Sequence, residues 1–434
     1  MDKIDFKEAF DRLPGTDGNT VIGSARTKAM QEFDRIGIPT VRNEEWKYTQ
    51  INSVFDKPFR VAAAETSLTA ADLGPVRLPG SESANELVFV NGIFSPTLSV
   101  IRSKGLVLLS LEEAAATPEY KPVVDEHFNH SNQYLKDGIN ALNTAFIHGA
   151  LFLHVQKNQV IGEPVYLYNI CDTRTGPVLA QPRSLVWIGE QAEVQFAETY
   201  ITLGTTESMT NQVMEMVVEE NANVNFCKLQ NDGPHASQVS TTHIRQIGRS
   251  LVNTVTISLN GGIVRNNLHA VLEAPNTEAH LYGLYFQRGK SHIDNHTLVD
   301  NVVPNCLSNE LYKGILDDQA SGVFNGKIYV RKDAQKTNAF QSNKNILLSE
   351  AANINTKPQL EIFADDVKCS HGCTIGSLDE DGLFYLQARG IPYKKAISLL
   401  LQGFAMDVLQ KIKPAVLRSY VEELIAARLT SDAL

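Results

Sequence analysis

Four short stretches that share one pattern decide the fold of this chain: Ile188-Gly-Glu-Gln-Ala-Glu-Val194, Val218-Glu-Glu-Asn-Ala-Asn-Val224, Leu316-Asp-Asp-Gln-Ala-Ser-Gly322 and Leu348-Ser-Glu-Ala-Ala-Asn-Ile354. Each has an aliphatic residue, an acid two positions later, an alanine two positions after that, and usually a final aliphatic residue. The first two begin 30 residues apart (188 to 218) and the last two 32 residues apart (316 to 348). A weak repeat of this size predicts a β-solenoid, because stacked coils bury a core that one coil could not bury, with the small alanine packed at a tight corner.

The region from about 150 to 376 has the composition that such a fold requires. Alternating apolar runs such as Leu151-Phe-Leu-His-Val155 and Val186-Trp-Ile188 recur, and Thr, Asn, Gly and Val are abundant. These features are typical of short strands joined by polar turns. A β-sandwich, in which strand–turn–strand units look repetitive by chance, is the alternative interpretation.

The two flanks carry helical patterns. Residues 20–37 have apolar residues near helical spacing, and Gly37 and Pro39 then stop the helix. Further on, Asn91-Gly92 between two apolar runs predicts a small hairpin. We therefore divide the chain into a mixed, mostly helical N-terminal domain (1–149), a solenoid core (150–376) and a C-terminal helical domain (377–434).

The C-terminal flank predicts three helices. Ser377-Leu-Asp-Glu380 has the spacing of a capping box, and Gly390 is a suitable stop for the helix that follows it. Two further helices are expected from Pro392 and from Pro414 to Arg428. Their apolar stripes indicate that they pack on the solenoid or offer a groove to a partner.

Composition excludes several function classes. The 434 residues are 43% apolar and carry a net charge of −10, with no Lys/Arg block longer than a pair, so neither nucleic acid nor an anionic membrane is an expected partner. No run approaches the roughly 18 apolar residues that span a bilayer. Five sparse cysteines and an N-terminus without an apolar leader predict a soluble protein of a reducing compartment, the cytoplasm.

The densest group of reactive side chains is Cys369, His371 and Cys373. Their spacing of two places all three on one face of a strand, where they could present thiolates and an imidazole to iron or zinc. Three ligands on one straight strand cannot surround a metal, so a complete site needs ligands from elsewhere. Two small buried cysteines flanking a turn histidine are the alternative.

Other acidic and histidine groups support weaker hypotheses. Asp365-Asp366, Asp317-Asp318, and Asp294 with His292 and His296 could supply the paired carboxylates of a β-helix carbohydrate-active enzyme. Residues 292, 294 and 296 would share a strand face, and a polar ladder is the simpler interpretation. No phosphate-binding loop, dinucleotide fingerprint or nucleophile elbow is present in the sequence.

Several motifs together resemble the SufB/SufD family of iron–sulfur cluster assembly proteins, and its SufD branch in particular. The run from Lys357 through Cys-Ser-His-Gly (369–372) to Gly376 carries most of the resemblance. It continues through Asp379-Glu-Asp-Gly-Leu-Phe-Tyr-Leu386 and Arg389-Gly-Ile391, and Gly37-Ile-Pro39 with Glu45-Trp-Lys-Tyr-Thr49 matches the opening motif.

The resemblance implies a mainly β fold, a right-handed parallel β-helix flanked by helical domains. It also implies a non-catalytic scaffold subunit that pairs with a SufB-like subunit, binds a SufC-like ATPase, and supports iron acquisition and cluster assembly or transfer. His371 would serve an iron or cluster site shared across the subunit interface. The isolated chain would then hold no tightly bound cofactor, and iron or a cluster would be present only transiently in the complex.

The resemblance also directs attention to individual residues. SufB-like sequences have a cysteine after Gln in the preceding strand, where this chain has Ser342, a poor ligand for iron. Cys373 departs from the family pattern, so it and Cys369 are weaker site candidates than His371. We expect the strand edge at 340–376 to pair with the SufB-like subunit, or with a second copy in an isolated homodimer. For the ATPase contact the candidates are Phe404, Asp407 and Val408. A stand-alone metal-binding protein is a further alternative.

Overall fold

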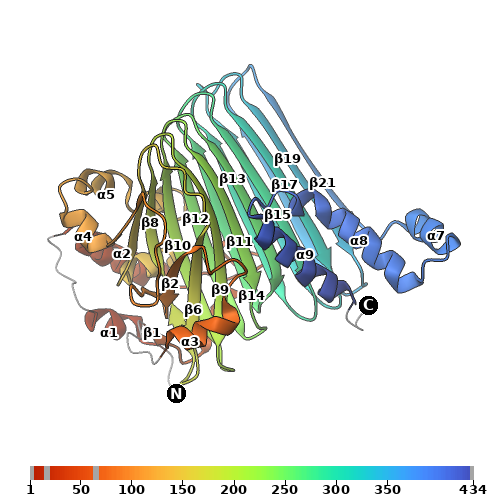
Figure 1. Cartoon of the computed structure of the whole chain (residues 1–434), viewed down its shortest axis with the longest axis horizontal. Coiled ribbons are helices and arrows are strands. Elements are labelled where there is room, and N and C mark those ends of the chain that lie inside the picture. The colour runs from red at the N-terminus through yellow and green to blue at the C-terminus, as the bar shows by residue number, and fades with distance from the viewer. Residues whose placement is uncertain (1–3, 14–19, 62–67, 431–434) are drawn as a thin grey trace.

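The computed structural model describes residues 4–13, 20–61 and 68–430. Residues 1–3, 14–19 and 62–67 of the expected N-terminal domain, and 431–434 of the C-terminal one, lie outside this described part. The predicted fold class is confirmed: residues 151–376 form a β-solenoid of about eight turns, with helical regions at both ends (Figure 1).

From residue 183 to residue 376 each coil contributes one strand to each of two long sheets, because each strand there pairs in parallel with the strand two places along the chain. The first sheet, sheet A, runs in the order β4 (Leu106–Ser110), β5 (Leu151–Val155), β8 (Arg183–Ile188), β10 (Ser208–Val218), β12 (Ala236–Gln246), β14 (Ile263–Leu272), β16 (His292–Asn301), β18 (Ser321–Val330) and β20 (Asn353–Ile362), with β1 (Arg60–Val61) and β7 (Val178–Ala180) beside it. Sheet B runs in the order β3 (Ile93–Phe94), β2 (Asn85–Val90), β6 (Val165–Asp172), β9 (Glu193–Leu203), β11 (Asn223–Asn231), β13 (Leu251–Asn260), β15 (Glu278–Gln287), β17 (Leu307–Leu316), β19 (Asn338–Leu347) and β21 (Lys368–Gly376).

The repeated stretches form the corners of the coils. Ile188 pairs with Val218, and Val194 with Val224, so the first two stretches stack in register. The last two stretches stack with Gly322 opposite Ile354, while Leu316 is opposite Leu347, one residue before the last stretch begins. The alanine of every stretch is buried, at 5% exposure or less. The tight corner filled by a small residue is therefore confirmed at Ala192, Ala222, Ala320 and Ala352.

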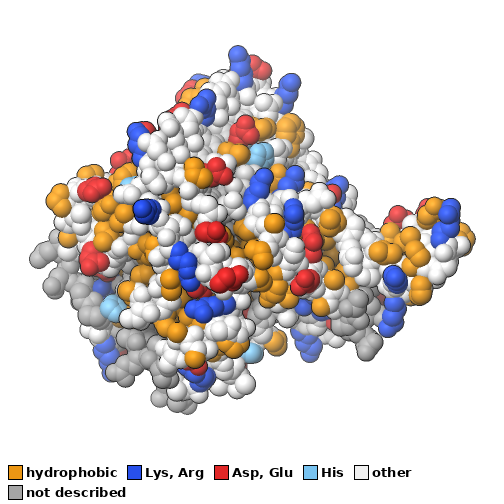
Figure 2. All heavy atoms as spheres, viewed as in Figure 1, with side chains coloured by type: hydrophobic (Ala, Val, Ile, Leu, Met, Phe, Trp, Pro, Cys, Tyr) orange, Lys and Arg blue, Asp and Glu red, His pale blue; other side chains and the backbone are white. Residues whose placement is uncertain are grey.

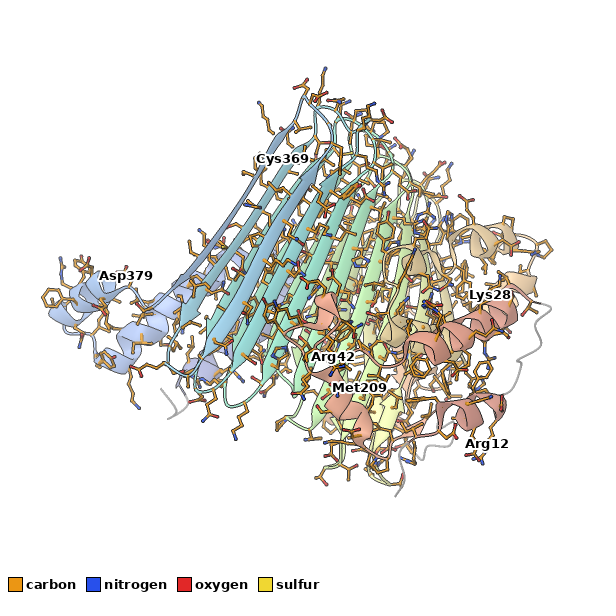
Figure 3. The ribbon with its side chains drawn as sticks, turned by 180° about the vertical axis from the view of Figure 1, so that it is seen from behind. Arg12, Lys28, Arg42, Met209, Cys369 and Asp379 are labelled. Atoms are coloured by element: carbon orange, nitrogen blue, oxygen red, sulfur yellow. The ribbon has the colours of Figure 1, made fainter. Side chains whose placement is uncertain are left out.

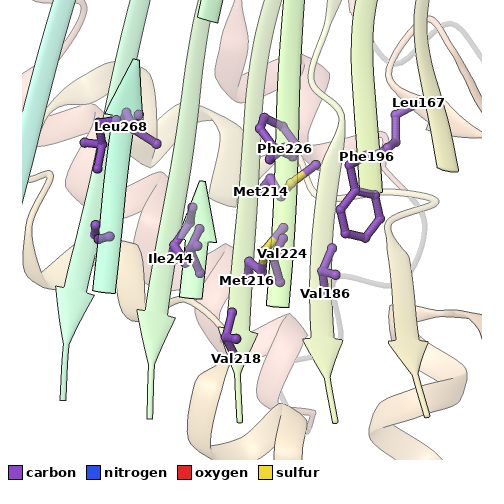
Figure 4. Close-up of a cluster of buried hydrophobic side chains, with 14 of the residues drawn as sticks. Leu167, Val186, Phe196, Met214, Met216, Val218, Val224, Phe226, Ile244 and Leu268 are labelled. Carbon is purple, nitrogen blue, oxygen red and sulfur yellow. The ribbon is translucent and has the colours of Figure 1, made fainter. Parts of the chain in front are cut away.

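The core lies between the two sheets. Met214 and Ile244 from sheet A meet Phe196 and Phe226 from sheet B in one continuous apolar cluster (Figure 4). Successive side chains of a strand point to opposite faces, so every second residue belongs to this interior. Burial of such apolar surface supplies the main stabilisation of the fold.

Most of the N-terminal region lies against the outer face of sheet A, whereas residues 68–84 lie on the sheet B side, where the Leu78 amide donates to the Tyr168 hydroxyl. The helix predicted over 20–37 is α2 (Val21–Ile36), capped by Thr20 and ended by Gly37, as expected. The helices of this region are α1 (Phe6–Asp11), α2, η1 (Glu44–Trp46), η2 (Ile51–Asp56), α3 (Ala70–Leu73), η3 (Gly74–Val76), α4 (Leu111–Ala116), α5 (Lys121–His127), η4 (His130–Gln133) and α6 (Gly138–Ala145).

Strands of the N-terminal region extend both sheets. The predicted hairpin is confirmed, because β2 and β3 pair antiparallel across Asn91 and Gly92, both with positive φ. Strand β2 pairs with β6, and β4 pairs with β5. The sheets thus begin before residue 150, and the domain boundaries stay a prediction.

Three C-terminal helices, α7 (Glu380–Ala388), α8 (Tyr393–Leu409) and α9 (Ala415–Thr430), match the expected number and order. Helices α8 and α9 cover the outer face of sheet B, where Leu401 and Val421 pack against Ile257 and Ile315. The predicted cap of α7 is wrong: Asp379, not Ser377, accepts the hydrogen bond from the Gly382 amide. An aspartate at that position satisfies the free amides as well as serine does.

None of the helices in the described ranges is long and apolar enough to cross a membrane.

Candidate functional site

The C-terminal end of the solenoid is uncovered. Strand β20 is the last strand of sheet A and β21 the last of sheet B, so each has one free edge of backbone hydrogen-bonding groups. Figure 3 shows Cys369 on β21, the last strand of sheet B, far from the N-terminal helices. Large apolar side chains are exposed on these final coils, namely Phe340, Ile362, Phe363 and Ile375. Such an edge with exposed apolar groups is a surface suited to pairing with another chain.

His371 lies on β21 and is exposed. Its position on the strand is defined by the pairing of β19 with β21, in which Gln341 is opposite His371 and Asn343 is opposite Cys373. Gln341 and Asn343 are buried in the solenoid interior, at 3% and 0% exposure. His371 and Cys373 therefore occupy positions of the interior face, and they are open to solvent because no further coil follows.

The three residues of the cysteine–histidine group share this face, as the spacing predicts, but their surroundings differ. Cys369 is partly buried and packs against a small apolar cluster that includes Ile328 and Ala339. This burial raises the pKa of the Cys369 thiol. Cys373 is exposed, while Ser342 belongs to the opposite face of sheet B from His371.

A buried carboxylate and a buried side-chain amide occupy the positions that align with His371 on the two preceding strands of sheet B. Glu310 is opposite Gln341 on the neighbouring strand, and the Gln341 amide donates a 2.7 Å hydrogen bond to the Glu310 carboxylate. Burial raises the pKa of Glu310 to about 7. The sequence analysis missed both residues, because only the register of the strands aligns them with His371.

The residues predicted to contact an ATPase attach α8 to the solenoid. Lys313 on β17 donates hydrogen bonds to the backbone oxygen of Phe404 (2.8 Å) and to the Asp407 carboxylate (2.6 Å). The hydrogen bond from Lys313 lowers the pKa of Asp407. Val408 is completely buried. Of the three, only Asp407 has a largely exposed side chain, with 64% of it accessible.

The opposite face of α8 and the arm formed by α7 are exposed. Leu399 and Met406, seven residues apart on α8, are 40% and 37% exposed. Helix α7 projects from the body of the molecule (Figure 1) and has no buried residue. Figure 2 shows its apolar side chains at the surface, where Phe384 and Tyr385 are mostly exposed.

Asp294 with its two histidines fastens an N-terminal segment to sheet A. The Thr49 hydroxyl donates to Asp294 (2.5 Å), and Arg265 and His296 contact the same carboxylate at 3.0 and 2.9 Å. Although burial alone would raise it, His296 and Arg265 hold the pKa of Asp294 well below its usual range. Residues 292, 294 and 296 therefore share one strand face and form a structural ladder that holds the segment around Trp46. The Arg265 guanidinium also lies over the Trp46 ring, 3.9 Å from the ring centroid.

This region does not offer the free paired acids of a glycosidase. A cavity of about 260 Å³ lies beside Asp294 and is also lined by Glu44 and Glu45. Glu44 pairs with Lys357 at 2.8 Å, and Glu45 with His296 at 3.4 Å. The hydrogen bond with His296 lowers the pKa of Glu45 to about 2. Every carboxylate that lines this cavity therefore has a cationic or imidazole partner.

Within the described residues, no group of three or more His, Cys, Asp or Glu side chains is arranged to hold a metal ion. His371 and Cys373 supply at most part of a ligand set. Any metal held at the open end would need further ligands from a partner, sulfide or water.

The chain is thus a scaffold-like parallel β-solenoid, flanked by helices, open at one end, with Cys-Ser-His-Gly (369–372) on its last strand. Residues 170–404 match the family described as SUF system FeS cluster assembly, SufBD core domain. Residues 6–167 match the SufBD protein N-terminal region. The chain belongs to the SufBD family of the SUF system for iron–sulfur cluster assembly.

Two of the curated relatives match almost the whole chain. An iron–sulfur cluster assembly SufBD family protein of Synechocystis sp. is 31% identical over 96% of this chain and 93% of its own length. The iron–sulfur cluster assembly protein SufD of Escherichia coli is 28% identical over 93% and 92%. The SufD protein of Bacillus subtilis is 26% identical over 72% and 71%. The resemblance to the SufD branch is thereby confirmed.

Proposed function

We propose that this chain is a non-catalytic scaffold subunit of a SUF-type assembly complex in the cytoplasm. It pairs with a SufB-like subunit through the open end of the solenoid and binds a SufC-like ATPase through its C-terminal helices. In this complex it supports iron acquisition and the assembly and transfer of clusters. The observation that carries the proposal is the uncovered last coil, which joins two free strand edges, exposed apolar side chains and His371 in one place.

The free edges favour pairing with another solenoid. Strands β20 and β21 end both sheets at the same coil, so a partner with matching edges can continue both ladders at once. Exposed Phe363 and Ile375 would be buried in such a contact. In the absence of the SufB-like subunit, the same edge pairs with a second copy of this chain.

His371 is the proposed contribution of this chain to an iron or cluster site shared across the interface, with Cys369 the weaker candidate because of its partly buried thiol. A neutral imidazole is a good ligand for ferrous iron. An incomplete ligand set on each side binds its cargo weakly enough to release it. The isolated chain accordingly holds no iron or cluster tightly.

The ATPase contact is proposed on the exposed side of α8. Asp407 lies beside Met406 on this helix, while Phe404 and Val408 hold α8 against the solenoid. A movement of the ATPase would then be transmitted to the sheet through Lys313. Conformational coupling of this kind needs no chemistry in the scaffold subunit itself.

The test is co-expression of this chain with the SufB-like and SufC-like subunits, followed by affinity purification and analysis of iron and sulfide. We expect His371→Ala to leave the complex assembled and to lower its iron and sulfide content. His235→Ala is the matched control, because it removes a half-buried imidazole from a turn far along the chain from the open end. A normal cluster yield with His371→Ala would assign His371 a structural role only.

A further inference from the structure

Cys373 differs from every other cysteine of the chain. All five cysteines lie in the described part, and Cys171, Cys227 and Cys306 are buried. Burial raises the thiol pKa to about 12 for Cys171 and Cys227 and to about 11 for Cys306, and it also raises the pKa of Cys369. A protonated, buried thiol is a poor metal ligand. Cys373 is the single exposed cysteine, and it is two residues from His371.

The strand geometry brings Cys373 and His371 to one face. Residues two apart on a strand are separated by roughly 6.6 Å and point the same way. Both side chains can therefore reach a common atom above the strand. Cys369 is also two residues from His371, but its thiol is partly buried against an apolar cluster. The thiol that can share a metal ion with His371 is thus the exposed Cys373.

The coil beneath this pair is held in place by hydrogen bonds. The Asn345 amide donates to the backbone oxygen of Thr374 at 3.3 Å, which fastens β21 next to Cys373. Asn343, opposite Cys373, donates to the Tyr285 hydroxyl and to the backbone oxygen of Tyr312. The backbone that carries the pair therefore lies on a fixed polar layer.

Gln341 is a second, independent indication of a ligand site. It is 3% exposed, and its Oε1 atom has no hydrogen-bond partner among the described residues. Buried polar atoms normally have partners. His371 is paired with Gln341 on the neighbouring strand. An imidazole that binds metal through one nitrogen usually donates its other N–H to a neighbouring oxygen. The free acceptor of Gln341 suits that role.

We propose that Cys373 is a second ligand beside His371, so that the chain offers one thiolate and one imidazole to a single ferrous or similar thiophilic divalent ion. This inference rests on the proposed function of His371 and adds a ligand to it. Binding releases the thiol proton to solvent and involves no change of oxidation state. Thiolate and imidazole together suit iron and zinc. Two ligands leave the remaining positions open for sulfide or for the partner subunit.

The test uses the isolated full-length chain under anaerobic conditions, with Zn²⁺ alone as the probe. The rate of iodoacetamide alkylation at Cys373 is followed by mass spectrometry with and without the metal. We expect Zn²⁺ to slow alkylation in the unsubstituted chain, His371→Ala to abolish this protection, and His235→Ala to retain it. An alkylation rate unchanged by Zn²⁺, or equally slowed in the His371→Ala chain, would overturn the proposal.

A second measurement separates this inference from the proposed function. In the co-expressed complex, Cys373→Ser is expected to lower the iron content, while Ser370→Ala, on the opposite face of the same strand, leaves it nearly unchanged. If Cys373→Ser gives normal iron content and His371→Ala does not, the role of His371 stands and that of Cys373 falls. If neither substitution changes the iron content, both fail.

Discussion

His371 is exposed because of its position along the solenoid. Gln341, one coil earlier on the same face, is buried, and Glu310, two coils earlier, is buried deeply enough for its pKa to rise to about 7. The equivalent strand position is therefore part of the core in the earlier coils and part of the surface in the last coil. A histidine at this position is accessible only while no partner covers the end of the molecule.

The buried ion pair of Arg265 and Asp294 gives a prediction at this scale. Both side chains are 1% exposed, so Arg265→Leu leaves a buried carboxylate with only His296 and Thr49 as polar partners. Loss of one member of a buried pair costs about 3–5 kcal/mol, and the remaining His296 contact places our expectation near 3 kcal/mol. Denaturant titration would measure this loss of unfolding free energy.

The control for this substitution is Arg249→Leu. The pair of Arg249 with Glu220 is at 3.6 Å, and both side chains are about half exposed. A surface pair of this kind contributes about 0–1 kcal/mol. Equal effects of the two substitutions would mean that the Asp294 cluster does not hold the N-terminal segment.

Buried histidines predict acid sensitivity in the same region. Burial keeps the pKa of His243 well below its usual range and lowers that of His269 to about 3. Because the unfolded chain takes up these protons near pH 6.5, the stability from the neutral forms is complete above that pH and is lost as pH falls below it. Glu310 acts in the opposite direction, since its raised pKa favours folding at the lower pH.

The measurement compares melting temperatures at about pH 7.5 and about pH 5.5, on either side of the ordinary histidine pKa. We expect the unsubstituted chain to melt at a lower temperature in acid, and His243→Gln to reduce the difference. His235→Gln, at a half-buried turn, is expected to leave the difference unchanged. An undiminished difference in His243→Gln would show that other groups cause the acid loss.

Among the elements, the corners of the coils carry the most specific sequence signal. Ala352 is buried at 5% exposure, while its neighbour Ala351 is exposed. Ala352→Leu forces a larger side chain into a packed corner, which costs about 1–3 kcal/mol. Ala351→Leu in the same turn is expected to change the free energy of unfolding by less than about 0.5 kcal/mol. Similar losses for both would contradict the corner packing described here.

Helix α8 provides the prediction for the ATPase contact. Leu399 and Met406 share its exposed face, so Leu399→Asp with Met406→Asp should weaken capture of the SufC-like ATPase without unfolding the chain. Val160→Asp, at an exposed residue that forms an isolated β-bridge with Glu193, is the matched control and should retain capture. Point substitutions are sharper than deletion of the helix, because deletion would expose the apolar outer face of sheet B. Undiminished capture by the double variant would place the contact elsewhere.

The elements also show how far sequence reasoning reaches. Alanine at a fixed place in each repeat predicted the solenoid because only a small residue fits the corner, and Gly37 predicted a helix end because few other residues tolerate positive φ. The spacing of apolar residues in the sequence did not show which part of the molecule covers a given helix face. The apolar stripe of α8 therefore drew attention to Val408, which is buried in the core, and left out Leu399 on the exposed side.

The candidate site was only partly predictable for the same reason. The spacing of Cys369, His371 and Cys373 placed all three on one face, and the structure agrees. The sequence could not show that this face belongs to the last coil, or that Cys369 packs into an apolar cluster while Cys373 stays exposed. Gln341 and Glu310 became visible only when strand pairing aligned them with His371.

At the scale of the whole molecule, the solenoid is closed on both faces and open at one end. Most N-terminal helices lie on sheet A, α3 lies with α8 and α9 on the side of sheet B, and the edges of β20 and β21 are left free (Figure 1). An assembly built on this shape buries the open end and leaves the helical faces for other contacts. The position of His371 at that end then follows from the architecture.

The most direct test of this account is hydrogen exchange of the chain with and without its SufB-like partner. We predict that binding slows exchange in peptides covering residues 368–376, because β21 gains a hydrogen-bonded neighbour. Peptides covering residues 151–155, at the opposite end of the solenoid, should exchange at an unchanged rate. Unchanged exchange at 368–376, with protection appearing at another surface, would contradict the account.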